Sequence, residues 1–210
     1  REYSWEIENY ENITKVSAMM VNEEKIGLFQ DAGQKKWYKG KLPNNVSRVE
    51  DLKELWAPEF KGGLVISEKI IKDPDILEKS VIYRPKSLVV GVGLHWDTSK
   101  NTISEGIKDV MQKNELSLRS IRNISTLQRD RKISGLHEFS SDYKIPVQMF
   151  SKEELASIPV PNPSEIVNKF EGTFSVAESS AILSSQGVLI VPKQKLPPNL
   201  TIAVARVRFD

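Results

Sequence analysis

The sequence predicts an α/β protein of two small layered domains, residues 1–85 and 86–210, the second with a mixed sheet flanked by helices. Short apolar runs that suit strands alternate with segments of helical periodicity, most clearly in the second half. Residues that cap helices or form turns stand at most junctions between these runs. The length of 210 residues suits one large domain or two small ones, and we place the boundary near Pro85.

The first half predicts two helices and three strands. Ile13, Val16 and Met20 stand at helical spacing within residues 9–23. Asp51 is expected to cap a second, shorter helix. Strands are expected at residues 25–29, 63–67 and 80–83, and a loop rich in Gly, Lys and Pro at residues 30–45. These elements predict a partial α/β domain that lacks a complete sheet of its own.

The second half opens with a strand over residues 87–92 that is apolar on both faces, as buried parallel strands are. A helix follows, and its apolar face is expected to hold Ile103, Ile107, Val110 and Met111. Thr102 with Glu105 fits a capping box at its start, while Thr98 and Ser99 are the alternative caps.

The remainder of the second half continues the alternation of strands and helices. Strands are expected at residues 120–127, 145–150, 188–191 and 201–207, and a helix at residues 134–142. Ser151 with Glu154, and Ser175 with Glu178, fit capping boxes at two further helix starts. Asn162-Pro163-Ser164-Glu165 predicts another start, with proline in the first turn.

Composition excludes several classes of protein. Hydrophobic residues make up 39% and charged residues 28%, which is typical of a folded globular chain. No apolar run is long enough to span a membrane, and a net charge of +2 argues against nucleic acid as a partner. The chain has no cysteine and two histidines, so we expect no disulfide, thiolate nucleophile or metal site. Arg1 opens a polar, charged segment, so we expect no signal peptide and a cytoplasmic protein. Because the sequence does not start with Met, we expect that the true N-terminus is missing.

Gly91-Val92-Gly93 is expected to break the strand and form a turn before the following helix. The dinucleotide fingerprint needs a third glycine where this chain has Trp96, so nucleotide binding is the weaker interpretation. A turn that only bends the backbone is another alternative. We expect the glycines to admit a substrate close to the backbone, beside helix-start amides that bind a carboxylate. Thr98 and Ser99 either hold that carboxylate or only cap the helix.

His95 and Asp97 follow the glycines and are the candidate catalytic residues. A histidine oriented by a carboxylate can act as a general base, although surface histidines without a catalytic role are common. His137 lies in a plain helical stretch and is expected to be structural. No serine-nucleophile motif is present, so a hydrolase of this sequence would use an activated water.

Basic residues gather in three places. One stretch of the second half holds Arg119, Arg122, Arg129, Arg131 and Lys132. Lys193 and Lys195 alternate along the segment after a strand, so an extended chain would turn both to one side. Lys35, Lys36 and Lys39 flank Trp37 and Tyr38 in the first loop. Such clusters are usually solvated faces, but rings beside ammonium groups suit a flat acidic ligand, so we expect Trp37, Tyr38, Lys193 and Lys195 to bind substrate.

Several strings, in order and across nearly the whole chain, resemble the CbiG family of cobalamin biosynthesis. They are Gln30-Asp31-Ala32-Gly33 with Trp37-Tyr38, Val89–Gly93 with Thr98-Ser99, Phe150–Leu155 with Ile158–Ser164, Gly172–Glu178, and Val191–Lys195. The resemblance implies that residues 1–85 are the family's middle region and residues 86–210 the C-terminal domain shared with the related protein CobE. It also implies that the family's N-terminal domain is absent from this sequence.

The resemblance implies a reaction. Enzymes of this family open the δ-lactone of cobalt-precorrin 5A, release acetaldehyde and give cobalt-precorrin 5B. The cobalt arrives with the tetrapyrrole substrate, so no cofactor of the protein is expected. A non-catalytic binder or carrier of corrin intermediates, as CobE permits, is the alternative. A homodimer and other enzymes of the corrin pathway are the expected protein partners.

Two departures from the family pattern bear on activity. Relatives usually carry a cysteine and basic residues after the glycines, where this chain has Leu94, His95 and Trp96. Relatives tend to carry Asp, Lys and Glu after Thr126, where this chain has Gln128, Asp130 and Ile133. If those side chains take part in catalysis, this protein would be slower, altered in substrate or inactive.

Overall fold

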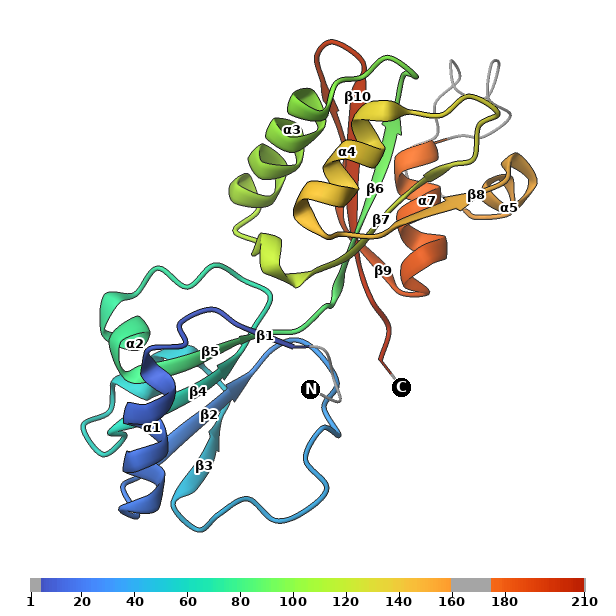
Figure 1. The fold of residues 1–210 in the computed structure, drawn as a ribbon. Helices are drawn as coiled ribbons and strands as arrows, with labels where there is room; N and C mark the ends of the chain where they lie inside the picture. Colours follow the sequence, from blue (N-terminus) through green and yellow to red (C-terminus); the bar gives the residue numbers. More distant parts are fainter. Residues whose placement is uncertain (1–4, 160–174, 210) are drawn as a thin grey trace. The chain divides into compact units, whose positions relative to one another are not determined.

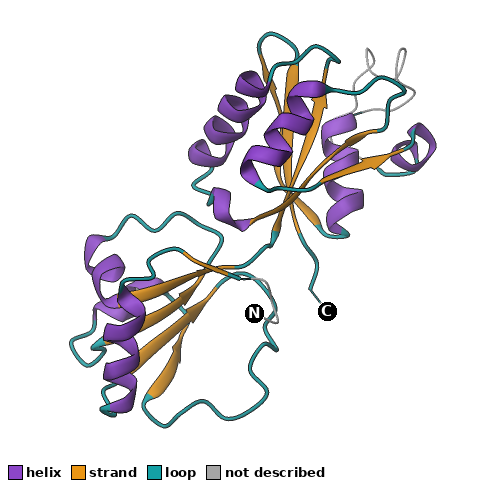
Figure 2. Ribbon diagram, viewed as in Figure 1, coloured by secondary structure: helices purple, strands orange, loops and turns teal. Residues whose placement is uncertain are grey.

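A computed structural model describes residues 5–159 and 175–209, and the predicted helix start at residues 162–165 lies outside them. The chain divides into two compact units, residues 1–86 with 209–210, and residues 87–208. Each unit has one five-stranded mixed sheet with helices packed on it (Figures 1 and 2). The predicted α/β class, with a mixed sheet flanked by helices in the second half, is confirmed.

The first unit has a complete sheet with the strand order β1-β5-β4-β2-β3. Its strands are β1 (Glu6–Ile7), β2 (Ile26–Gln30), β3 (Val46–Val49), β4 (Gly62–Ile66) and β5 (Ser80–Arg84). All neighbouring pairs are parallel except β1 with β5. The expectation of a partial domain without its own sheet is therefore wrong, because β1 and β3 were not predicted. Both are edge strands of two to four residues, too short for an alternating pattern to show.

Helices cover both faces of this sheet. α1 (Asn12–Val21) brings Val16 and Met19 toward a face that also carries Ile26 and Leu28. η1 (Leu52–Trp56) and α2 (Pro74–Lys79) bury their apolar side chains on the other face, where the core holds Val49, Leu55, Phe60, Val65, Ile71, Ile76 and Ile82. Asp51 caps η1, as the sequence predicted, and it does so in a full capping box. α2 was missed, although Asp73 caps it and Pro74 occupies its first turn.

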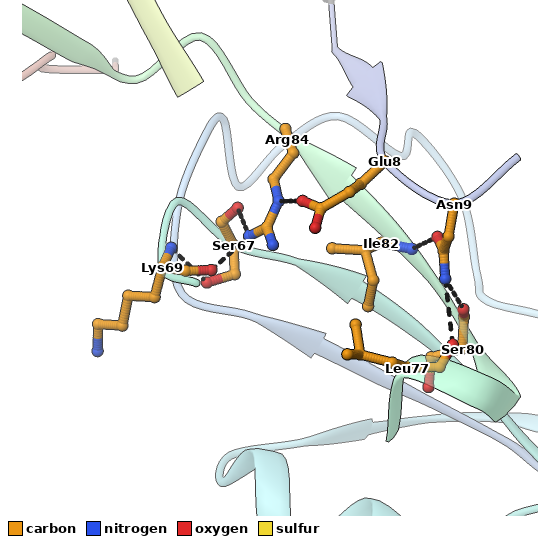
Figure 3. A network of polar contacts seen from close by, with 8 residues as sticks. All are labelled: Glu8, Asn9, Ser67, Lys69, Leu77, Ser80, Ile82 and Arg84. Atoms are coloured by element: carbon orange, nitrogen blue, oxygen red, sulfur yellow. Dashed lines mark hydrogen bonds and ion pairs between the residues drawn. The ribbon is translucent and has the colours of Figure 1, made fainter. Parts of the chain in front are cut away.

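A polar network fastens the segment before α1 to β5 (Figure 3). Asn9 is buried. Its side chain accepts a hydrogen bond from the Ile82 amide at 2.8 Å and donates one to the Ser80 carbonyl at 2.7 Å. The Arg84 guanidinium is 1% exposed, pairs with the Glu8 carboxylate and donates to the carbonyl of Ser67 at 2.9 Å. A buried guanidinium needs such partners, because an uncompensated charge in the interior is strongly destabilising.

The second unit has the strand order β8-β7-β6-β10-β9. Its strands are β6 (Leu88–Leu94), β7 (Ile121–Leu127), β8 (Val147–Phe150), β9 (Val188–Leu196) and β10 (Leu200–Arg206). β6, β7 and β8 are parallel, whereas β10 runs antiparallel to both β6 and β9. Its other elements within the described residues are α3 (Lys100–Lys113), η2 (Leu118–Ser120), α4 (Ser134–Tyr143), α5 (Lys152–Ala156) and α7 (Val176–Ser185).

The two faces of this sheet are covered differently. α3 and α4 cover one face and share the largest core with alternate residues of β6, from Leu88 to Leu94. α7 packs on the opposite face, against β6, β7 and β10, as Figure 1 shows. Gly91 lies under α7, where a Cβ atom would overlap the carbonyl oxygen of Ala177. Close packing between α7 and β6 therefore requires glycine at this position.

Several local predictions are corrected by the structure. Gly91 and Gly93 do not form a turn, because β6 continues through both to Leu94. Ser99, not Thr102, caps α3, and its hydroxyl accepts the Thr102 amide. Ser175 makes no side-chain cap to α7. The capping box of Ser151 and Glu154 at α5 is confirmed.

Candidate functional site

The loop that joins β6 to α3 holds the predicted catalytic pair. Nδ1 of His95 lies 2.6 Å from Oδ1 of Asp97, and both side chains are about half exposed. Thr98 is buried, and its hydroxyl accepts the His95 amide at 3.1 Å while its own amide donates to the His95 carbonyl. The threonine thus holds a tight turn that keeps the histidine and the aspartate together.

Electrostatics at this pair favour an ionised carboxylate. The hydrogen bond from His95 is the main cause that holds the pKa of Asp97 below its usual range, and the charge of Arg131 acts in the same direction. In a neutral imidazole, a carboxylate that accepts from Nδ1–H leaves Nε2 as the nitrogen that can accept a proton. The pair therefore has the arrangement that a general base requires.

Two helix N-termini meet beside this loop. Ser99 caps α3 at 3.1 Å from the Thr102 amide, and its hydroxyl also lies 2.9 Å from that of Thr102. α4 begins against the same turn, because Gly135 in its first turn packs on the backbone of Thr98 and Lys100. No side chain caps α4, since Ile133 occupies that position. Amide groups of both first turns carry partial positive charge, which favours an anion here.

A hollow of about 340 Å³ lies at this junction. It is lined by Trp96, Asp97, Thr98, Ser99, Lys100, Arg131, Lys132, Ser134, Gly135 and Glu138. The guanidinium of Arg131 stacks on the Trp96 ring, 3.5 Å from its centroid. The ring of His95 lies on the same tryptophan, with centroids 5.4 Å apart. The predicted catalytic pair, basic side chains and two helix starts thus share one small region.

The cations of the hollow differ in their engagement. Lys100 donates to Asp142 at 2.8 Å, and this contact is the main cause that raises the pKa of Lys100. Arg131 and Lys132 enter no ion pair within residues 5–159 and 175–209. These two cations are therefore available to an acidic ligand, which would compete for them with the carboxylates of Asp97 and Glu138 in the same hollow.

The other predicted residues of this unit lie on the α7 side of the sheet. Gly93, Thr201 and Lys195 face one another across β6, β10 and β9, and the Thr201 hydroxyl donates to the Gly93 carbonyl at 3.2 Å. Lys193 lies in the same strand as Lys195, at a bulge in which two residues of β9 oppose Ala203. The strand expected at residues 188–191 extends to Leu196 and so includes both lysines. Their binding role stays a prediction.

Trp37 and Tyr38 lie in the first unit, on the loop between β2 and β3. They line a cavity of that unit together with Trp5 and Tyr83. Trp37 is fixed there by its Nε1, which donates to Oε1 of Gln30 at 2.9 Å. The structure thus sorts the predicted site residues into three places, namely the β6–α3 loop, the α7 side of the second sheet and the first unit's cavity.

Some residues of the site were not predicted. Glu178 was expected to complete a capping box, yet its carboxylate is fully buried and accepts the amide of Lys193 at 3.0 Å. Arg131 and Lys132 were noted only as part of a basic cluster, and Glu138 not at all. These three residues line the hollow only because the start of α4 packs against the start of α3. The spacing of residues in the sequence does not reveal that packing. Within the described residues no three acidic or histidine side chains are placed to hold a metal ion, and no helix is long and apolar enough to cross a membrane.

Comparison with known proteins identifies the family. A family model described as Cobalamin synthesis G C-terminus matches residues 88–205, and one described as Cobalamin biosynthesis central region matches residues 1–85. The chain belongs to the CbiG family. The resemblance to CbiG expected from the sequence is thereby confirmed, and with it a place in cobalamin biosynthesis.

Relatives of this CbiG-family chain include a curated protein and solved structures. A cobalt-precorrin-5A hydrolase of Priestia megaterium is 32% identical over 214 residues, which cover the whole chain and 57% of that protein. The chain therefore spans little more than half the length of this relative. CobE, from the cobalamin biosynthetic pathway, aligns with a TM-score of 0.56 and 20% identity over 59% of the chain and 95% of CobE. A cobalamin biosynthesis protein G homologue from Sulfolobus solfataricus aligns with a TM-score of 0.49 and 22% identity over 97% of the chain and 57% of its own.

Proposed function

We propose that this protein hydrolyses the δ-lactone of cobalt-precorrin 5A, releases acetaldehyde and gives cobalt-precorrin 5B. The observation that supports this most is the position of the His95–Asp97 pair beside a hollow with two helix N-termini and two available cations. The relative from Priestia megaterium bears the name of this activity. The cobalt belongs to the substrate.

In the proposed reaction, Asp97 orients His95 so that Nε2 accepts a proton from a water molecule. The resulting hydroxide attacks the lactone carbonyl, and amides at the starts of α3 and α4 stabilise the negative charge that develops on its oxygen. The ester C–O bond then breaks and leaves a carboxylate and a hydroxyethyl group on the ring. Loss of the hydroxyl proton forms the C=O bond of acetaldehyde, and the electrons of the broken C–C bond pass to the macrocycle.

Substrate acids provide a reason for the basic side chains. Corrin precursors carry acetate and propionate groups around the ring, and a charge-assisted hydrogen bond to such a group contributes about 1.5–3 kcal/mol. Arg131 is well suited to hold a carboxylate, because its planar fork can donate two parallel hydrogen bonds while it stays stacked on Trp96. Thr98 already serves the turn with its hydroxyl and its amide, and the Ser99 hydroxyl caps α3, so the Ser99 backbone amide is the better donor to a ligand.

The test is turnover. The chain is incubated with cobalt-precorrin 5A, and acetaldehyde is measured with alcohol dehydrogenase and NADH, with the Priestia megaterium hydrolase as the positive control. We expect acetaldehyde in proportion to substrate consumed, and its loss in the His95→Ala variant. Binding of the substrate without acetaldehyde would instead support a carrier of corrin intermediates.

A further inference from the structure

The first unit contains an apolar cavity that is separate from the hollow beside His95. Its volume is about 480 Å³, within the range of about 300–1,000 Å³ that is usual for small-molecule sites. Its lining comes from α1, from the sheet and from the long loop between β2 and β3. Its walls include Trp5, Trp37, Tyr38 and Tyr83, with Met20 of α1 and Leu42 of the loop.

Four aromatic rings form a connected surface in this cavity. Trp37 lies 5.6 Å from both Trp5 and Tyr38 between ring centroids, and Trp5 lies 6.4 Å from Tyr83. The planes are inclined by 59° to 61°, so the rings present both faces and edges. Such a surface suits a flat conjugated ligand, which gains from stacked and edge-to-face contacts beyond its burial.

The cavity offers few groups for hydrogen bonding. The indole nitrogen of Trp37 already donates to Gln30. Burial raises the pKa of Tyr83, so its hydroxyl stays neutral and adds no charge to the wall. The enclosed part of a ligand should therefore be apolar, because a polar group without a partner is costly to bury.

Charge lies instead on the loop that supplies two of the cavity walls. Lys35, Lys36, Lys39 and Lys41 belong to the loop that supplies Trp37 and Tyr38, and all four are exposed. None of them enters an ion pair within the part of the chain that the structure describes. A ligand that fits both features has an apolar body and an acidic perimeter.

We propose that this cavity binds the ring of a tetrapyrrole carboxylate, with its conjugated face on the aromatic walls and its acids at the loop lysines. The choice of a tetrapyrrole rests on the proposed function. An aliphatic acid matches the polarity but not the breadth of the aromatic surface.

The test is a titration of the whole chain with coproporphyrin, a porphyrin carrying propionates, followed by the shift of its Soret band at low salt. Ser17→Trp places a large ring in the cavity from an exposed position on α1, and it replaces a small lining residue while leaving the aromatic walls unchanged. We expect it to weaken binding at least about tenfold. Replacing the four loop lysines by Gln should weaken binding about tenfold at low salt and less at high salt, because salt screens exposed charges.

Matched controls lie on the opposite face of the same sheet. Trp56→Ala removes an exposed tryptophan of η1, and Lys53→Gln an exposed lysine, so both should bind coproporphyrin as the unchanged chain does. Lauric acid is added as a competitor and should not displace the porphyrin. Full binding by Ser17→Trp with an unchanged melting temperature, equal loss in the controls, or displacement by lauric acid would each overturn the proposal. If Ser17→Trp does not fold, the lysine variant decides alone.

This outcome is separable from that of the hydrolase proposal. Suppose that Ser17→Trp and the lysine variant both weaken porphyrin binding, and that the unchanged chain releases no acetaldehyde. This result supports the proposal for the cavity and refutes the proposal of hydrolase activity. Acetaldehyde release together with porphyrin binding that neither variant alters refutes the cavity alone.

Discussion

Gly135 lies directly on the backbone of Thr98, where a Cβ atom would overlap the threonine carbonyl oxygen and come within 2.7 Å of the Lys100 amide nitrogen. This contact brings the start of α4 to the start of α3 and so forms the hollow beside His95. Backbone atoms cannot move aside as a flexible side chain can.

Gly135→Ala should therefore destabilise the second unit and separate the two helix starts. Overpacking of this kind costs about 1–3 kcal/mol, which urea unfolding at neutral pH can measure. Gly40→Ala is the control, because a Cβ atom there would meet only an ordinary contact with Tyr38. A Gly135→Ala variant as stable as the control would show that α4 can shift without cost.

Gly91 and Gly93 should differ in their tolerance of a methyl group. At Gly91 the Cβ atom would overlap the Ala177 carbonyl, whereas at Gly93 it would meet the Thr201 hydroxyl, which can rotate away. We expect Gly91→Ala to lower the midpoint of urea unfolding strongly and Gly93→Ala to lower it little. Acetaldehyde release by a folded Gly93→Ala variant then tests whether a substrate needs this position free, and normal release would remove Gly93 from the site.

His95→Ala should return the pKa of Asp97 toward its ordinary value, because the hydrogen bond from the ring is the main cause that lowers it. A lowered carboxylate pKa means that the contact stabilises the fold at neutral pH and is lost as the pH falls through the lowered value. Carbon-13 NMR of the Asp97 carboxyl can follow this titration. An Asp97 titration unchanged by the substitution would show that the pair does not form in solution.

The same substitution should lower kcat by about 100-fold or more, as expected for loss of a general base, while KM changes little. Asp97→Asn should lower kcat less, since the ring remains but its orientation is no longer held by a charge. His137→Ala provides the matched histidine control. A fall in kcat/KM that comes entirely from KM would assign His95 to binding.

Replacing Lys193 and Lys195 together by Ala should weaken tetrapyrrole binding at least about tenfold, or ~1.4 kcal/mol, at low salt. Both lie in β9, and Lys195 is in register with Thr201 beside Gly93. The double variant of Lys113 and Lys152, exposed lysines of α3 and α5, should bind normally. Equal affinity of the two double variants would place the substrate away from β9.

The extent to which the sequence anticipated this structure depended on the range of the interactions. α3 and α4 were predicted because their apolar periodicity is a local property, and the Ser151 box because its partners are three residues apart. β1 was missed because it is a strand only through pairing with residues far along the chain. The interruption expected at Gly91 was wrong for a related reason, since glycine is needed there by α7, which follows it by more than 80 residues.

The candidate site followed the same pattern. His95 and Asp97 were predicted as a pair and lie in hydrogen-bond contact, because a two-residue spacing in a tight turn brings them together. The hollow next to them was not predicted, because Arg131 reaches Trp96 only after α4 has packed on α3. Residues that act through a distant contact are not visible in a local pattern.

The polar contacts of Glu8 and Asn9 with β5 determine how far the first unit can be shortened from its N-terminal side. A chain that began at Tyr10 would keep every helix and every parallel strand, yet it would leave the Arg84 guanidinium without its carboxylate and the Ile82 amide without its acceptor. Removing one partner of a fully buried pair costs about 3–5 kcal/mol, and this pair should cost less because a third of the Glu8 side chain is exposed. The short run before α1 is therefore part of the folding unit, and any trimming or fusion at that end has to leave Glu8 in place.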